Sequence, residues 1–165
     1  MTSLGVSSIW DPQAVQLAHG AGLGAHLEMR IGGKTHPSSG PPFDGLFEVR
    51  TLADPGWQSF VESRVTLGKT AVVRLVGTEV DIILNSNRTQ TFDPNIFTNL
   101  SLDPRQKQVL LVKSTNHFYA AFAPLAQNIL HVAVPTGYPS DPATAPYRKL
   151  TRALWPRVAQ PFKEV

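Results

Sequence analysis

The spacing of apolar residues changes between the two halves of this chain, and that change limits the folds it can adopt. Over residues 25–31 apolar and polar side chains strictly alternate, and the same alternation recurs in residues 47–50 and 61–67. A two-residue period is typical of strands that bury one face and leave the other polar. The first half therefore predicts strands of an antiparallel meander.

Turn signals divide these strands. Asp54-Pro55-Gly56 predicts a turn, and Gly77 lies between two apolar segments, residues 70–76 and 80–84, which predict a hairpin. Asp11 precedes Pro12, a pattern that predicts the capped start of a short helix ending in the glycine-rich residues 20–24.

The second half lacks clean alternation. Val109–Val112 and residues 129–134 are apolar runs of the kind found in buried parallel strands. Residues 117–127, between them, have a suitable length for a right-handed crossover helix that Pro124 should interrupt. We therefore expect an α+β fold (mixed α/β), in which the antiparallel meander joins a βαβ-like unit. The mixed sheet should carry few short helices in a single domain of residues 1–165.

Composition excludes several kinds of protein. The chain has no cysteine, which rules out disulfides, thiolate metal sites and a cysteine nucleophile. The net charge is +3, and the basic residues are scattered without interleaved aromatics, so we expect no nucleic-acid binding. An apolar run long enough for a membrane span and a signal-peptide pattern are both missing, and we expect a cytoplasmic protein that binds no membrane.

The most informative segment for function follows the apolar run Val109–Val112. Lys113 comes directly after it, and His117 follows three small polar residues. In open α/β sheets ligands lie beyond the carboxyl ends of strands, and helix N-termini attract anions. The alternative reading, equally favoured by the residues alone, is that Lys113 is solvated, Asn116 only caps a helix and His117 packs locally. A second basic loop contains Lys34 and His36, although a solvated loop is the simpler reading there.

The chain lacks a recognisable catalytic constellation. Neither the H-E-x-x-H metal motif nor the G-x-S-x-G nucleophile motif occurs, and most aspartates precede proline, where capping explains them. The glycines of residues 20–24 follow a predicted helix and precede a strand, which is the wrong order for a dinucleotide-binding loop. We therefore assign neither a catalytic residue nor a metal ligand to this chain.

The order of short motifs resembles the C-terminal domain of the microcystinase C (MlrC)-like metallopeptidases. These motifs run from near Asp11 to Pro156, and the segment beginning at Lys113 is the most specific. They are Ala21-Gly22-Leu23-Gly24-Ala25, Gly32-Gly33-Lys34, Gly40-Pro41-Pro42, Leu67-Gly68-Lys69-Thr70-Ala71-Val72, Asn87-Arg88-Thr89-Gln90-Thr91-Phe92-Asp93, Lys113-Ser114-Thr115-Asn116-His117-Phe118, Tyr147-Arg148-Lys149-Leu150 and Trp155-Pro156. The chain departs from the family at Tyr119, where arginine is usual, and at residues 135–137, where proline and glycine are usually adjacent.

The resemblance implies that the catalytic half lies outside this chain. In that family a larger N-terminal domain carries the zinc ligands, so zinc is expected in the missing catalytic domain and no cofactor is expected here. The expected partner is that N-terminal domain or a separate subunit, with a peptide or small amide as substrate and assembly into a homo-oligomer left open. Residues that would line the substrate cleft are Lys113, Ser114, Asn116, His117, Tyr119, Lys34 and His36.

Two other functions remain open at this point. The chain could be a stand-alone, non-catalytic module that binds an anion, a small molecule or a protein through exposed strand edges. It could also be an independent hydrolase with a site built from His36, His117 and scattered aspartates, although this explains the fewest motifs.

Overall fold

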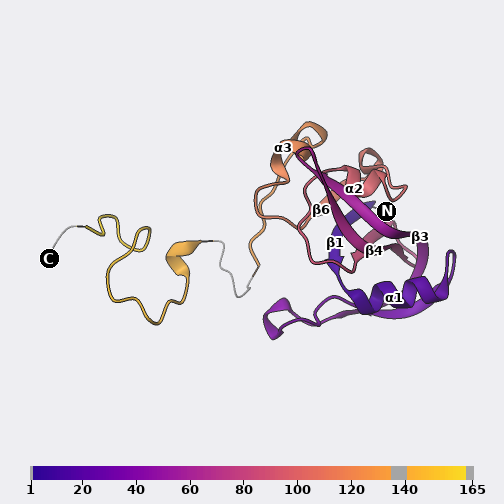
Figure 1. Cartoon of the computed structure of the whole chain (residues 1–165), viewed down its shortest axis with the longest axis horizontal. Coiled ribbons are helices and arrows are strands. Elements are labelled where there is room, and N and C mark those ends of the chain that lie inside the picture. Colours follow the sequence, from indigo (N-terminus) through magenta and orange to yellow (C-terminus); the bar gives the residue numbers. More distant parts are fainter. Residues whose placement is uncertain (1, 135–140, 163–165) are drawn as a thin grey trace. The chain divides into compact units, whose positions relative to one another are not determined.

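A computed structural model describes residues 2–134 and 141–162, and the chain divides into two units, Met1–Ile129 and Leu130–Val165. The first unit contains a sheet and short helices (Figure 1). Its strands are β1 (Leu4–Trp10), β2 (His26–Ile31), β3 (Phe43–Phe60), β4 (Ser63–Leu75), β5 (Val80–Asn85) and β6 (Val109–Val112). Its helices are α1 (Pro12–Ala21), α2 (Asn95–Thr98) and α3 (Tyr119–Phe122), with 3₁₀ turns at Pro37–Ser39, Pro104–Gln106 and Ala123–Leu125.

The six strands form one mixed sheet in the order β2-β3-β4-β5-β1-β6. Strands β2 to β5 pair antiparallel as a meander, whereas β1 is parallel to both β5 and β6. The predicted α+β class, with a mixed sheet and few short helices, is confirmed. The predicted turn at Gly77 is also confirmed, since Thr78 N donates to Leu75 O between β4 and β5.

The source of the parallel pairing differs from the prediction. Residues 129–134 form no strand, and Leu130 and Val132 are 85% and 80% exposed, so the strand expected there is wrong. Strand β1, which was not predicted, supplies the parallel partner of β6 instead. An apolar run shows only that a segment is suited to pairing, because the ladder also requires a neighbouring edge that sequence does not reveal.

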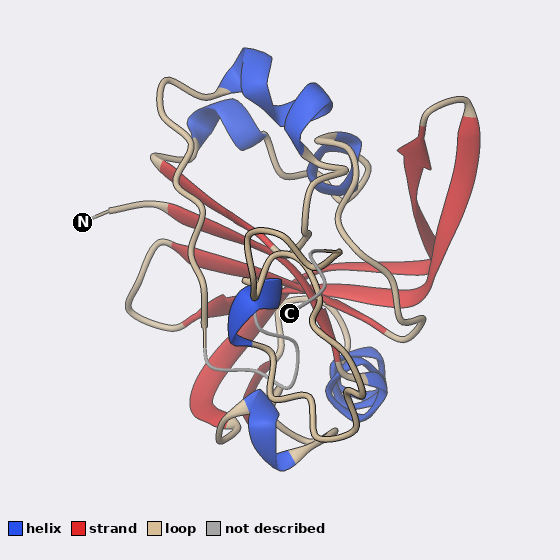
Figure 2. Ribbon diagram, turned by 90° about the vertical axis from the view of Figure 1, so that its left-hand side faces the viewer, coloured by secondary structure: helices blue, strands red, loops and turns tan. Residues whose placement is uncertain are grey.

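The predicted turn at Asp54-Pro55-Gly56 is wrong, because β3 continues through it. Shifts of register around Gly56 absorb the extra residues, and a Cβ on Gly56 would collide with Thr70 of β4. The hairpin instead turns at residues 61–62, where Val61 has a φ of 55°. Strands β3 and β4 consequently form a long arm, with its far end beyond the rest of the sheet in Figure 2.

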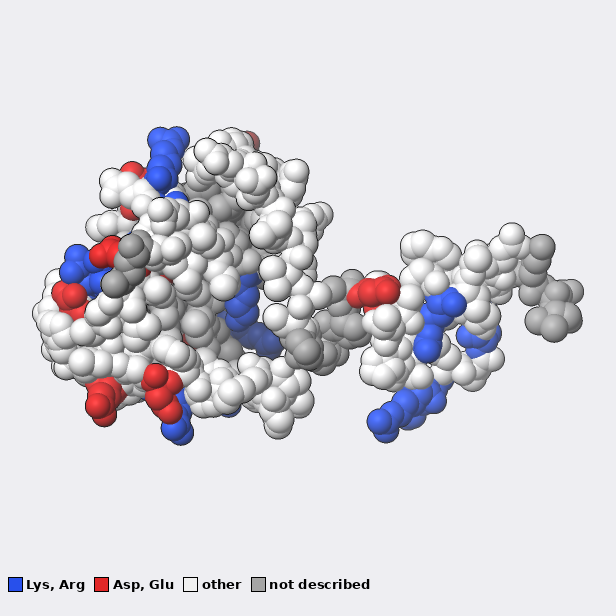
Figure 3. Space-filling model, turned by 180° about the vertical axis from the view of Figure 1, so that it is seen from behind, with Lys and Arg blue, Asp and Glu red and all other residues white. Residues whose placement is uncertain are grey.

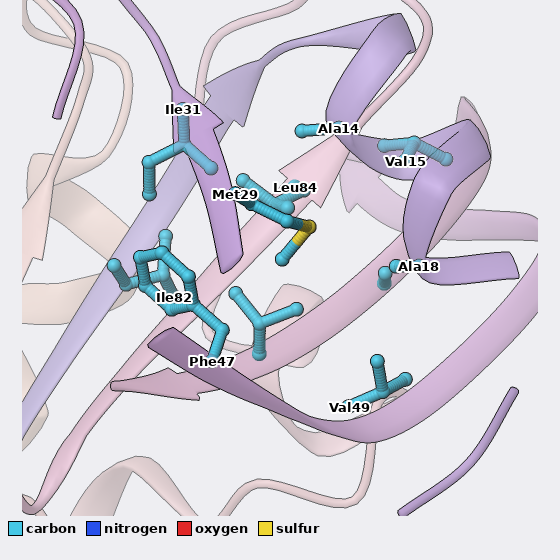
Figure 4. Close-up of a cluster of buried hydrophobic side chains, with 11 residues drawn as sticks. Ala14, Val15, Ala18, Met29, Ile31, Phe47, Val49, Ile82 and Leu84 are labelled. Atoms are coloured by element: carbon cyan, nitrogen blue, oxygen red, sulfur yellow. The ribbon is translucent and has the colours of Figure 1, made fainter. Parts of the chain in front are cut away.

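Each face of the sheet has its own hydrophobic core. On one face α1 packs over the meander strands, as the close-up in Figure 4 shows. This cluster comprises Ala14, Val15, Ala18, Met29, Ile31, Phe47, Val49, Ala71, Val73, Ile82 and Leu84. On the other face the short helices α2 and α3 contribute to a second cluster, made of Leu67, Val72, Ile83, Ile96, Phe97, Leu100, Phe118 and Phe122. Residues that alternate along β4 and β5 thus serve opposite faces.

Local signals account for the helix ends. The Asp11 side chain accepts a hydrogen bond from Ala14 N at 3.0 Å, which confirms the predicted cap of α1. The helix expected over residues 117–127 is much shorter, since α3 has four residues and a 3₁₀ turn follows. Pro124 lies in that turn, as expected of a residue that lacks the N–H needed to continue an α-helix.

The second unit has little regular structure in its described residues. A 3₁₀ turn, Pro142–Thr144, is capped by the Asp141 side chain, which accepts from Ala143 N at 2.9 Å. Its basic residues include Arg148, Lys149 and Arg152, and Lys and Arg side chains of this unit are drawn in blue in Figure 3. Residues 135–137, where the chain departs from the family pattern, lie outside the described part. Within the described residues, no helix is long and apolar enough to cross a membrane.

Candidate functional site

The candidate site lies where the parallel strands β5, β1 and β6 end. After β1 the chain enters α1 on one face of the sheet, whereas after β5 and β6 it enters α2 and α3 on the other face. At such a switch the connections separate and leave the carboxyl ends of the strands open. This is the edge that Lys113 was predicted to occupy.

The segment from β5 crosses this edge to reach β6. Asn85 pairs with Trp10 at the end of β1, and six residues later Thr91 N donates to Lys113 O at 3.2 Å. Arg88, in the middle of this crossing, places its guanidinium 5.8 Å from the centre of the Trp10 ring. The indole N–H donates to Ser86 O at 2.8 Å, which fixes the ring beneath the arginine.

Lys113 is the first residue after β6 and is anchored through its backbone. Its N–H donates to Ser7 O of β1 at 2.9 Å. Partial burial and, next, the positive charge of Arg88 lower the pKa of Lys113 below its ordinary value. In the part of the chain that the structure describes, neither Lys113 nor Arg88 has an acidic partner.

Unpaired polar atoms occur on the backbone segments that meet here. The buried side-chain oxygens without a hydrogen-bond partner among the described residues are Ser7 Oγ, Ser8 Oγ, Asn85 Oδ1 and Thr91 Oγ1. All four belong to residues at most 2% exposed. Ser7 and Thr91 are also the residues bonded to the backbone of Lys113. Since buried polar groups are normally paired, their grouping at one edge distinguishes this edge from the rest of the sheet.

Gln90 supports the loop that follows Lys113. Its side-chain oxygen accepts from Ser114 Oγ at 3.0 Å and from the N–H and hydroxyl of Thr115, both at 3.4 Å. Its carbonyl in turn accepts from the buried Gln58 of the arm at 2.7 Å. The arm therefore holds the loop in position, and Ser114, a predicted substrate-binding residue, already uses its hydroxyl within the fold.

The other predicted substrate-binding residues of this loop, Asn116, His117 and Tyr119, differ in their surroundings. His117 makes edge-type ring contacts with Phe60 of the arm and with Phe92, at centroid distances of 5.3 and 6.0 Å. Asn116 is exposed, and its carbonyl accepts from Tyr119 N at 3.1 Å, whereas no side-chain cap begins α3. The Tyr119 side chain is 51% exposed. Their contact with a substrate stays a prediction.

Lys34 and His36 belong to another loop, between β2 and β3. Lys34 forms an ion pair of 2.7 Å with the buried carboxylate of Asp11, which directly follows β1. The charge of Lys34 is therefore neutralised within the fold. His36 Nδ1 contacts Ser38 Oγ at 2.8 Å and accepts from Ser38 N at 3.1 Å, so its ring caps a 3₁₀ turn.

The described residues do not fit a zinc ion. Protein zinc sites with one open position require three nitrogen, oxygen or sulfur ligands that converge on the metal. No group of three His, Cys, Asp or Glu side chains with that arrangement occurs within residues 2–134 and 141–162. The chemistry available at this edge is ionic and hydrogen-bonding recognition by Lys113 and Arg88.

Sequence reasoning missed Arg88, Trp10 and Gln90 as members of this site. Arg88 and Gln90 lie in a motif that carries the family resemblance, which was the available signal. Trp10 ends a strand that was not predicted, so its place beside Arg88 had no sequence signal.

The fold and this edge define a class, an α+β domain with a basic site at the carboxyl ends of parallel strands. Residues 1–149 match the family described as MlrC C-terminus, and the chain therefore belongs to the MlrC C-terminal domain family. Microcystinase C from Sphingomonas sp. is 33% identical over 151 residues, which are 92% of this chain and 29% of that protein.

A crystal structure described as "Putative metallopeptidase from Mesorhizobium sp. BNC1" has the same fold. It is 23% identical, with a TM-score of 0.78 over 94% of this chain and 31% of that chain. The chain thus spans about 30% of the length of these two proteins.

Proposed function

We propose that this chain is the C-terminal, non-metal-binding domain or subunit of an MlrC-like zinc metallopeptidase. The observation that carries the proposal is that nearly all of this chain aligns with only a small part of its relative. The chain aligns over 92% of its own length with only 29% of microcystinase C, and its described residues offer no metal-ligand group. A hydrolytic centre of this family would therefore be supplied by the remaining region.

In this proposal the chain helps to form the substrate cleft. Zinc, held by the partner domain, would supply a water molecule activated for attack on a peptide or amide carbonyl. Lys113 would orient the substrate as a point charge, while the exposed Asn116 and Tyr119 would contact it from the loop after β6. His117 would act mainly by keeping this loop packed against the arm, as its contacts with Phe60 and Phe92 support.

A second function, protein binding without catalysis, is favoured by one observation. Strand β6 is at the end of the described sheet order, and its Val109 and Leu111 are 48% and 51% exposed. Apolar residues on an unpaired strand edge are suited to pairing with another chain, a second copy of this one included. The Leu111→Lys variant should then abolish a concentration-dependent increase in mass in sedimentation experiments. A chain that is monomeric with Leu111 in place contradicts the version in which copies self-pair.

The proposed function is tested by metal content and peptide hydrolysis of the purified chain, before and after loading with zinc and dialysis. We expect no stoichiometric zinc to remain and no turnover. Retention of one zinc per chain together with hydrolysis would contradict the proposal, and His36 and His117 would then be the first residues to mutate.

A further inference from the structure

Two cations share one edge of the sheet, and neither has an acidic partner among the described residues. Lys113 is fixed by backbone bonds to Ser7 and Thr91, and Arg88 is held over the ring of Trp10. The other lysine at this edge, Lys34, is paired with Asp11. The partly buried Arg74 and Lys107 both pair with Asp81. Lys113 and Arg88 are instead exposed cations that have no acidic partner in the described part of the chain.

Ser7 and Thr91, which are bonded to the backbone of Lys113, carry hydroxyls suited to a ligand that accepts hydrogen bonds. The hydroxyls of Ser7 and Thr91 are buried and have no hydrogen-bond partner within residues 2–134 and 141–162, and each can donate one hydrogen bond. Asn85 uses its amide nitrogen on Asn87 O and leaves its buried oxygen unpaired. That oxygen would accept from a water molecule or from a ligand N–H or O–H.

We propose that Lys113 and Arg88 together bind one oxyanion, a carboxylate or a phosphate, at the carboxyl ends of β5, β1 and β6. Arg88 lies over the Trp10 ring, with its guanidinium carbon 5.8 Å from the ring centre, and its planar fork can bind two oxygens of one anion. Lys113 supplies the second charge, and the Ser7 and Thr91 hydroxyls supply neutral donors. The lowered pKa of Lys113 supports this arrangement, because a bound anion would offset the repulsion between the two cations.

The identity of the anion as a substrate carboxylate rests on the proposed function, whereas the site itself does not. The MlrC-like partner would act on peptides, which carry carboxylates, and phosphate would indicate a different ligand. Binding to the purified chain in the absence of any catalytic domain separates the two ideas.

The test is calorimetric titration of the whole chain with glutarate and, separately, with inorganic phosphate, both at a constant ionic strength set with potassium chloride. We expect saturable binding of glutarate that weakens at least about tenfold in Lys113→Met and in Arg88→Met, since each loses a charge-assisted contact. Lys69→Met is the matched control, because Lys69 is an exposed lysine 3.4 Å from Asp54, and it should bind as the wild type does.

A second readout keeps the test independent of folding. Lys113→Arg retains the charge and should retain most of the affinity, and saturating anion should raise the pKa of Lys113 in the wild-type chain. Binding of phosphate alone would support the oxyanion site but contradict its link to a peptide carboxylate. No saturable binding of either anion, or equal weakening in Lys69→Met, would overturn the site.

Discussion

Lys113 and Arg88 carry like charges at one edge of the sheet, and their proximity affects protonation. Partial burial and then the charge of Arg88 hold the pKa of Lys113 below its ordinary value. The unfolded chain lacks both effects, so it binds more protons than the folded chain between the lowered and the ordinary pKa values. Stability should therefore rise with increasing pH through that interval.

Replacing Arg88 with Met removes the charge and keeps an extended side chain. We expect the pKa of Lys113 to rise toward its ordinary value without reaching it, because partial burial remains. An NMR titration of lysine side chains measures this pKa, and the exposed Lys69 serves as an internal reference. A Lys113 pKa that stays constant or falls would contradict the assigned proximity.

Asp81 shows the opposite arrangement, a buried acid with two basic partners. It accepts two hydrogen bonds of 2.8 Å from Arg74 and a shorter one from Lys107. Burial would raise the pKa of Asp81, but the hydrogen bonds and charges of Arg74 and Lys107 outweigh it and lower the pKa. The resulting stability is present above the ordinary pKa and is lost as the pH falls through the lowered one.

Asp81→Asn should reduce the free energy of unfolding by about 3 kcal/mol at pH 7, because it leaves two cations without their buried partner. The deficit should shrink below about pH 4, the ordinary range of an aspartate, as the wild-type carboxylate also becomes protonated. Urea denaturation at pH 7 and pH 3 measures both values. Asp44→Asn, which breaks an exposed pair with Arg30, is the control and should have a much smaller effect. An equal deficit at both pH values would be inconsistent with this account.

At the scale of elements, the connection after β5 positions Arg88 by resting on β4. Ser86 and Asn87 donate backbone hydrogen bonds to the carbonyls of the residues on either side of Gly68, at 3.0 and 2.9 Å. Gly68 has a φ of 67°, and a Cβ there would collide with the side chains of Ser86 and Asn87. A glycine is therefore required at this point for the loop to approach the strand.

Gly68→Ala should lower the free energy of unfolding by about 1–3 kcal/mol, because of strain at positive φ and displacement of the loop. It should also raise the pKa of Lys113, since Arg88 moves with the loop. Gly20→Ala is the matched control, because Gly20 lies in α1 with open space around it and alanine should stabilise the helix by about 0.5–1 kcal/mol. Thermal unfolding and the NMR titration measure these effects, and a Gly68→Ala variant as stable as the wild type would refute the stated role.

The features predicted from sequence were those fixed by neighbouring residues. The cap at Asp11, the turn at Gly77 and the end of a strand at Lys113 each depend on a few adjacent side chains. The place of β1 and the failure of residues 129–134 to form a strand depend on which edges are available for pairing. Alternation and turn signals contain no such information.

The same distinction applies to the candidate site. Lys113 was found because a cation ends an apolar run, which is a local signal. Arg88 was missed because its approach to Lys113 depends on the connection that crosses the end of β1, a contact between distant parts of the sequence. Trp10 and the arm residue Gln58 join the site for the same reason.

At the scale of the whole molecule, the length of the relatives is the decisive fact. The chain accounts for about 30% of microcystinase C and of the Mesorhizobium structure, and its described residues hold no metal-ligand group. It nevertheless builds a two-sided core and an ordered basic edge. These properties support the proposal that the chain contributes substrate recognition and that a hydrolytic centre would be supplied by another region.

Complementation tests this account most directly. The purified chain is titrated into the purified region of microcystinase C that it does not cover, and zinc-dependent peptide hydrolysis is compared with that of the same region alone. The relative's own C-terminal region is the positive control, and Lys69→Met and Lys113→Met are compared in the chain. We predict a gain in hydrolysis that saturates at a 1:1 ratio, with a higher KM for Lys113→Met only. No gain at 1:1, where the relative's own region restores activity, would contradict the proposed function.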